Sequence, residues 1–264
     1  MWAALALTTV VSVAPAQLEL KNVRTTYGVL GQERKDTKLL PGDMLVVAFD
    51  IDGLKVKDDG RVLYSMGIEL TKKGKDKPEF KREPQDLEAV NSLGGSSLPA
   101  FGMTFINTEA EAGEYTFKIT VRDRQNKGAE KVLNHTFEVI PVRLGFTLLK
   151  LTSGSGEPVP NVGVPGQRVW FHHSLVGYEL GKDKQPNVTF EMQVLDEAGK
   201  PVVSKPFKGE FKEADPKTPG LMAFAPVPLD LNRTGKFKIV LKATDNIARK
   251  STEQALDLTV MGGK

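Results

Sequence analysis

Two stretches of this chain, about 120 residues apart, carry nearly the same sequence pattern. Residues 41–49 read PGDMLVVAF, and residues 165–173 read PGQRVWFHH. A second pair follows, with AGEYTFKITVRD at 112–123 and TGKFKIVLKATD at 234–245. Because the repeat distance equals the size of an ordinary domain, it predicts two copies of one fold made by internal duplication.

The hydrophobic pattern has a period of two within these repeats. In 115–122 the apolar residues Tyr, Phe, Ile and Val alternate with Thr, Lys, Thr and Arg, and 237–244 follows the same rule. Such alternation is typical of antiparallel strands with one face on a core and the other in water. Gly-containing turns such as 58–60 and 197–200 separate the runs. The pattern predicts an all-β chain of two tandem antiparallel β-sandwiches.

The predicted boundaries follow from the ends of the repeat. Residues 1–16 form a short apolar run that ends in Ala14 and Ala16, as a secretory signal peptide would, although an N-terminal strand is the alternative. The first sandwich is then expected over 17–141 and the second over 142–264, joined by the short connector 141–143. A connector this short that contains Pro should restrict the angle between the domains.

Composition narrows the classes of function. The chain has no Cys, which excludes disulfides, thiol nucleophiles and Cys-zinc sites and favours a bacterial exported protein. The net charge of +3 gives no indication of nucleic acid as a partner. No segment after the signal is apolar enough to span a membrane, so no membrane insertion is expected once the signal is removed.

The runs 113–123 and 235–245 resemble the penultimate strand of bacterial immunoglobulin-like and cadherin-like modules. In those modules a Gly-x-aromatic turn leads into an alternating strand that ends in Asp, here Asp123 and Asp245. The resemblance implies two immunoglobulin-like sandwiches in an exported, non-catalytic binding or spacing protein, and it carries over no catalytic residues. We expect both Asp side chains to cap the following turn through backbone amides.

Calcium is the one cofactor that the sequence raises, because cadherin-like modules bind it. Asp50 and Asp52 are the candidate ligands. The repeat argues against them, since the second copy has Ser174 and Val176 at these positions. Solvated carboxylates near a turn are the alternative interpretation.

The second copy of the Pro-Gly strand suggests a binding face. Arg168, Trp170 and His172 alternate with core-type residues and should point outward together, whereas His173 takes the inward position of Phe49. Arg and Trp are enriched at binding hot spots, and an exposed indole can also stack on a sugar. The alternative is that Trp170 packs beneath the loop 152–164 or against the other domain.

Three hypotheses of function follow. The first is a non-enzymatic exported binding or spacer protein of the periplasm or cell surface, with a protein or polysaccharide of the cell envelope as its partner. The second is a carbohydrate-binding accessory module that uses the Trp170 face. The third is a calcium-dependent, cadherin-like adhesion module.

Overall fold

The computed structural model describes residues 17–126, 128–215 and 217–262. Within these ranges all regular structure is β, in seventeen strands, so the prediction of an all-β chain is confirmed. The predicted signal peptide, 1–16, lies outside the described residues. In the described part of the chain there is no helix long and apolar enough to cross a membrane.

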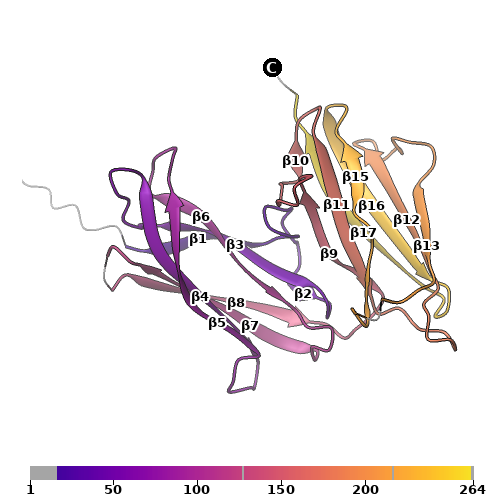
Figure 1. Ribbon diagram of the computed structural model, residues 1–264, viewed down its shortest axis with the longest axis horizontal. Coiled ribbons are helices and arrows are strands. Elements are labelled where there is room, and N and C mark those ends of the chain that lie inside the picture. Colours follow the sequence, from indigo (N-terminus) through magenta and orange to yellow (C-terminus); the bar gives the residue numbers. More distant parts are fainter. Residues whose placement is uncertain (1–16, 127, 216, 263–264) are drawn as a thin grey trace, which may run out of the picture.

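The first half of the chain forms two antiparallel layers. Its strands are β1 (Glu19–Thr25), β2 (Lys38–Leu39), β3 (Met44–Asp52), β4 (Arg61–Lys72), β5 (Phe80–Val90), β6 (Ser97–Phe105), β7 (Gly113–Asp123) and β8 (Glu130–Val139). One sheet has the order β1-β3-β6 and the other β2-β8-β7-β4-β5. In Figure 1 these two sheets lie one above the other. Only the short β2 runs parallel to its neighbour.

The second half repeats this topology. Its strands are β9 (Gly145–Thr152), β10 (Val162–Gly163), β11 (Arg168–Val176), β12 (Val188–Asp196), β13 (Phe207–Phe211), β14 (Leu221–Ala223), β15 (Val227–Asp230), β16 (Gly235–Asp245) and β17 (Lys250–Val260). The sheets are β9-β11-β14/β15 and β10-β17-β16-β12-β13. Strand by strand this matches the first half, except that the counterpart of β6 is split into β14 and β15. The predicted pair of immunoglobulin-like sandwiches is therefore confirmed.

Each sandwich has its own hydrophobic core. One core is built from residues between Leu18 and Val139 and the other from residues between Leu144 and Val260. The predicted alternation holds in β7, where Tyr115, Phe117 and the following apolar residues are at most 1% exposed. Apolar residues of both layers thus face inward, which is the main favourable contribution to folding.

Asp123 and Asp245 have the same structural role in the two copies, as the sequence predicted. The Asp123 carboxylate accepts hydrogen bonds from the backbone amides of Lys55, Gln125 and Asn126 at 2.7–3.1 Å. Asp245 accepts the equivalent three, at 2.7–3.1 Å. Each buried carboxylate therefore satisfies a turn and also ties it to a second loop of its sandwich.

The two sandwiches meet at the beginning of β3 and β9. The buried Asp43 carboxylate forms an ion pair with Arg34 at 2.7 Å and accepts a hydrogen bond from the backbone amide of Leu148 at 3.1 Å. Leu148 has a positive φ of 55° at a bulge where β9 shifts register against β11. Gly42 sits so close that a Cβ there would lie 2.9 Å from Val176 of the second sandwich.

The loop after β1 extends this junction. The Arg34 guanidinium stacks over the Tyr27 ring at 4.5 Å, and the Tyr27 hydroxyl accepts a hydrogen bond from Gln254 at 3.3 Å. Gln32 accepts from the backbone amide of Asp257 at 2.7 Å and donates its own backbone amide to Asn161 at 2.9 Å. The two sandwiches are therefore joined by polar contacts as well as by the connector.

Candidate functional site

The predicted outward face of β11 has the expected arrangement. Arg168 is exposed, whereas Trp170 and His172 are half-buried, and the inward neighbours Val169 and Phe171 are buried. Trp170 lies opposite Thr152 of β9 and Pro228 of β15. A Cβ added at Gly154, in the loop 152–164, would lie 3.7 Å from the indole nitrogen. The indole therefore packs beside this loop with part of its surface open.

Both polar neighbours of Trp170 already have partners. Arg168 forms a two-pronged ion pair with Asp230, with nitrogen–oxygen distances of 2.6 and 3.0 Å. The His172 ring nitrogen Nε2 shares a hydrogen bond with the Thr152 hydroxyl at 2.8 Å. Burial, with a contribution from the Lys150 charge, lowers the pKa of His172 below its usual range. The result is an ordered polar surface around one half-exposed indole.

Asp50 and Asp52 lie on the outer side of β3, each beside an existing partner. Asn22 donates to Asp50 at 2.7 Å, and Lys21 lies 3.0 Å from Asp52. Hydrogen bonds from Ser97 and Lys21 lower the pKa of Asp52. Among residues 17–126, 128–215 and 217–262, no group of three or more His, Cys, Asp or Glu side chains could hold a metal ion. Calcium binding at Asp50 and Asp52 stays a prediction.

His173 has an unusual environment in the second core. Its ring stacks on Phe190 and Phe224 at centroid distances of 4.6 Å and on Phe171 at 5.3 Å. It is 3% exposed, and neither ring nitrogen has a hydrogen-bond partner among the described residues. Burial, with a smaller contribution from His172, lowers the pKa of His173 to about 4. At neutral pH this imidazole is an uncharged part of the aromatic core.

A second surface, on β6, was not predicted from the sequence. Phe101, Met103 and Phe105 point to the outer side of the sheet and are 39%, 41% and 49% exposed. On β3 they lie opposite Ala48, Val46 and Met44, of which Val46 is fully buried. We call Phe101, Met103 and Phe105 the β6 stripe. Alternation alone would have placed these three side chains in the core, whereas in the structure Gly102 and Thr104 take the inward positions.

The β6 stripe lies on an edge strand without the usual protection. β6 is terminal in its sheet and has no charged residue across its nine positions. Every other described edge strand of four or more residues has at least one charged residue. Charges on edges block pairing with other chains, and Pro99 protects only the beginning of β6.

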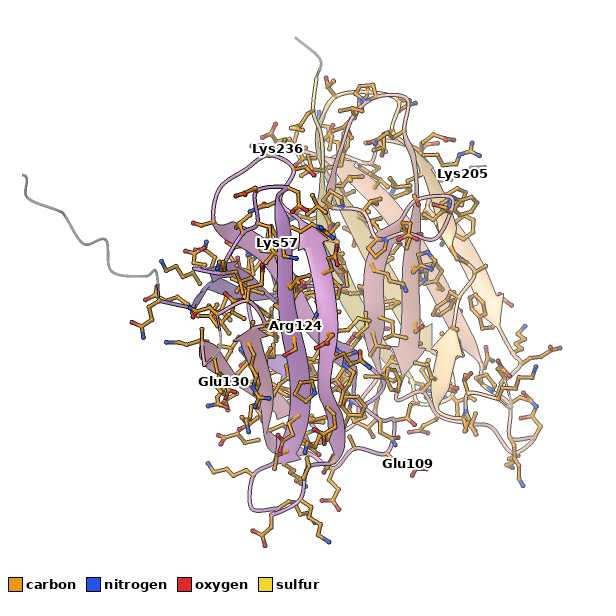
Figure 2. All side chains as sticks on the ribbon, turned by 60° about the vertical axis from the view of Figure 1, so that its left-hand side comes forward. Lys57, Glu109, Arg124, Glu130, Lys205 and Lys236 are labelled. Carbon is orange, nitrogen blue, oxygen red and sulfur yellow. The ribbon has the colours of Figure 1, made fainter. Side chains whose placement is uncertain are left out.

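The outer face of the neighbouring five-stranded sheet shows the ordinary pattern. Ion pairs cross it, including Arg124–Asp86 at 2.8 Å, Lys118–Glu69 at 3.4 Å and a pair between Arg122 and Glu130. Arg124 and Glu130 both come from this sandwich in Figure 2. The contrast with the β6 stripe is chemical, since one surface is charged and solvated and the other is apolar.

Comparison with protein-family models and with curated proteins found no match. Among solved structures, the chain is similar to red sea bream transglutaminase, with a TM-score of 0.29 and 8% identity over 94% of this chain and 32% of that one. It is similar to the C-terminal domain of the Streptococcus pyogenes antigen I/II-family protein AspA, with a TM-score of 0.30 and 10% identity over 93% and 100% of the two chains. It is also similar to the C-terminal domain of the Streptococcus agalactiae AgI/II polypeptide BspA, with a TM-score of 0.29 and 9% identity over 90% of this chain and 99% of that one. Likenesses at this level assign neither a family nor an activity.

Proposed function

We propose that the chain is an exported, non-enzymatic module of the cell envelope that binds a protein partner along the edge of β6. The observation that carries this proposal is the β6 stripe, three exposed apolar side chains on an uncharged edge strand. Unpaired backbone groups on such an edge can pair with an added strand, and the alternating side chains give the contact specificity. Exposed apolar patches of this kind mark interaction sites.

The junction at Asp43 supports the structural part of the proposal. Asp43, which is paired with Arg34 in its own sandwich, accepts a hydrogen bond from Leu148, and further polar contacts between the sandwiches favour one fixed arrangement. In this arrangement β6 ends at the junction, because the backbone amide of Ile106, the residue after β6, donates to the Asp43 carbonyl there and the Ile106 carbonyl accepts from Gly42. The second sandwich would then act as a rigid spacer that orients the β6 stripe.

The test is photo-crosslinking in the organism that makes the protein. A photoreactive amino acid replaces Met103 in one strain and Lys238, an exposed residue of β16, in the control strain. We expect a covalent adduct with one other envelope protein at position 103 that is absent at 238. No adduct at 103, or adducts only between copies of this chain, would contradict a heterologous partner.

A carbohydrate is the second candidate ligand, at the face formed by Arg168, Trp170 and His172. The observation that favours it is a partly open indole flanked by fixed polar side chains. The only other Trp is Trp2, within the predicted signal peptide, so Trp170 fluorescence reports directly on this face. We expect oligosaccharides that bind here to change that emission, and calorimetric binding of the same oligosaccharides to be lost in Trp170→Ala. Glycan binding that persists unchanged in Trp170→Ala would contradict this site.

A further inference from the structure

A pocket of about 450 Å³ opens between the two sheets of the second sandwich. Its walls are mainly apolar and include Val194, Phe207, Leu229, Phe237 and Leu258. Leu229 pairs with Val169, near the beginning of β11, whereas the junction with the first sandwich contacts the end of β11. The pocket therefore lies near the beginning of β11, whereas Gly42 of the first sandwich approaches Val176 at its end.

The internal repeat explains why this pocket exists. Tyr115 and Phe137, which are neighbours in the first sandwich, stack with their rings 5.7 Å apart and fill its core. Their counterparts by register are Phe237 and Leu258, so one aromatic ring is missing in the second copy. The edge strand of the five-stranded sheet also differs between the copies, since β5 has eleven residues and its counterpart β13 has five. A smaller side chain and a shorter edge strand leave the space unfilled.

Exposed apolar side chains surround the entrance of the pocket. Val203 and Phe207 are 57% and 56% exposed, which places apolar surface at the opening. Lys205, between them in sequence, lies on the side of the second sandwich turned away from the first (Figure 2). Large exposed apolar side chains beside a pocket are typical of a binding site for an apolar ligand.

The charge at the entrance is positive. Arg233 is one of the residues that line the pocket, and its guanidinium stacks over the Phe237 ring at 5.1 Å. Asp230 also lines it, but its carboxylate is held by Arg168. In the described part of the chain, the ion pairs of this region join Arg168 to Asp230 and Lys236 to Glu197 and do not include Arg233. Arg233 is thus available to an anion.

We propose that this pocket binds a free single-chain amphiphile with an acidic head group, of the fatty-acid class. The aliphatic chain would lie between the sheets against Val194, Leu229 and Leu258, and the carboxylate would contact Arg233. The volume lies within the range of roughly 300–1,000 Å³ that is usual for small-molecule sites. The proposal goes beyond the protein-binding function and does not depend on it, because β6 belongs to the other sandwich.

The experiment is calorimetric titration of the full chain with dodecanoate below its micelle concentration. We expect a dissociation constant of about 1–100 μM, in line with ligands of this size. Dodecyltrimethylammonium, with the same tail and a cationic head, should bind at least about tenfold more weakly. Arg233→Gln should weaken dodecanoate binding about tenfold and bring the two amphiphiles closer together, as loss of one charge-assisted contact predicts.

Two further variants test the position of the tail. Leu258→Phe introduces the ring that the first sandwich has and should remove binding by filling the pocket. Because Leu258 is buried, a second variant, Phe207→Ser on the exposed rim, should weaken binding without disturbing the core. Phe80→Ser is its matched control, since Phe80 begins the edge strand β5 of the first sandwich and is 42% exposed.

The outcomes are decisive in both directions. Dodecanoate binding that is lost in Leu258→Phe, weakened in Phe207→Ser and unchanged in Phe80→Ser supports the proposal. No heat with the wild-type chain overturns it, and so does equal binding of both amphiphiles that Phe207→Ser leaves intact. Either result would leave the β6 crosslinking test unaffected.

Discussion

The Asp43 carboxylate in the first sandwich accepts a hydrogen bond from the backbone amide of Leu148 in the second, at 3.1 Å. Leu148 is the positive-φ residue of a bulge in β9, and Asn22 is its counterpart in β1, with a φ of 51°. In the first copy the Asn22 side chain binds Asp50 on its own sheet. The bulge residue therefore forms a hydrogen bond within its own sheet in the first copy and a hydrogen bond to the other sandwich in the second copy.

Asp43→Asn should destabilise the protein and loosen the junction. The change removes one charge of a buried pair and leaves Arg34 uncompensated, which costs about 3 kcal/mol in comparable sites. Urea unfolding should show the loss, and small-angle X-ray scattering should show a broader range of interdomain distances. Asp59→Asn is the control, because Asp59 and Arg61 are exposed, and it should leave both measurements unchanged. Identical scattering for Asp43→Asn and wild type would show that the connector alone fixes the arrangement.

Asp245→Asn should cost the second sandwich about 2 kcal/mol of stability, and Asp123→Asn should do the same to the first. In the wild-type chain three backbone amides donate to each carboxylate. The Asn side chain offers them only one neutral oxygen, which is a weaker acceptor, and an NH2 group that cannot accept. Thermal unfolding followed by proteolysis should show which half of the chain opens first. If both variants opened the same half, the matched roles assigned to the two carboxylates would be wrong.

Acidification should destabilise the second sandwich through His173. Its folded-state pKa of about 4 lies below the usual 6.5, so the unfolded chain binds more protons between these pH values. The free energy of unfolding should be highest above about pH 6.5 and fall as the pH drops toward 4, by up to about 3 kcal/mol.

His173→Phe isolates this effect, because Phe49 has the same position in the first sandwich. The phenylalanine should stack on Phe190 and Phe224 and flatten the pH profile of stability between pH 6.5 and 4.5. Urea midpoints across that interval measure the difference between variant and wild type. Parallel profiles for the two proteins would show that other groups cause the acid sensitivity.

Removal of divalent cations should leave the melting temperature unchanged. Lys21 already neutralises Asp52, and Asn22 already donates a hydrogen bond to Asp50, so a calcium ion would have to displace both contacts. A site at 100 times its dissociation constant would add about 2.7 kcal/mol, which calorimetry detects easily. A lower melting temperature in EDTA that calcium restores, and that Asp50→Asn abolishes, would establish the calcium hypothesis instead.

The sequence by itself determined the fold class, the duplication, the outward side of Arg168, Trp170 and His172, and the role of Asp123 and Asp245. These features depend on local patterns, because side chains alternate across a strand and a carboxylate after a strand meets the next turn. The tertiary structure decided the partner of Asp43, the exposure of the β6 stripe and the pocket beside Leu258. Alternation separates the two faces of a strand, but which face stays open depends on what packs from elsewhere in the chain. At Leu258 the second sandwich lacks a ring that the first one has, and the pocket lies between this position and the short edge strand β13.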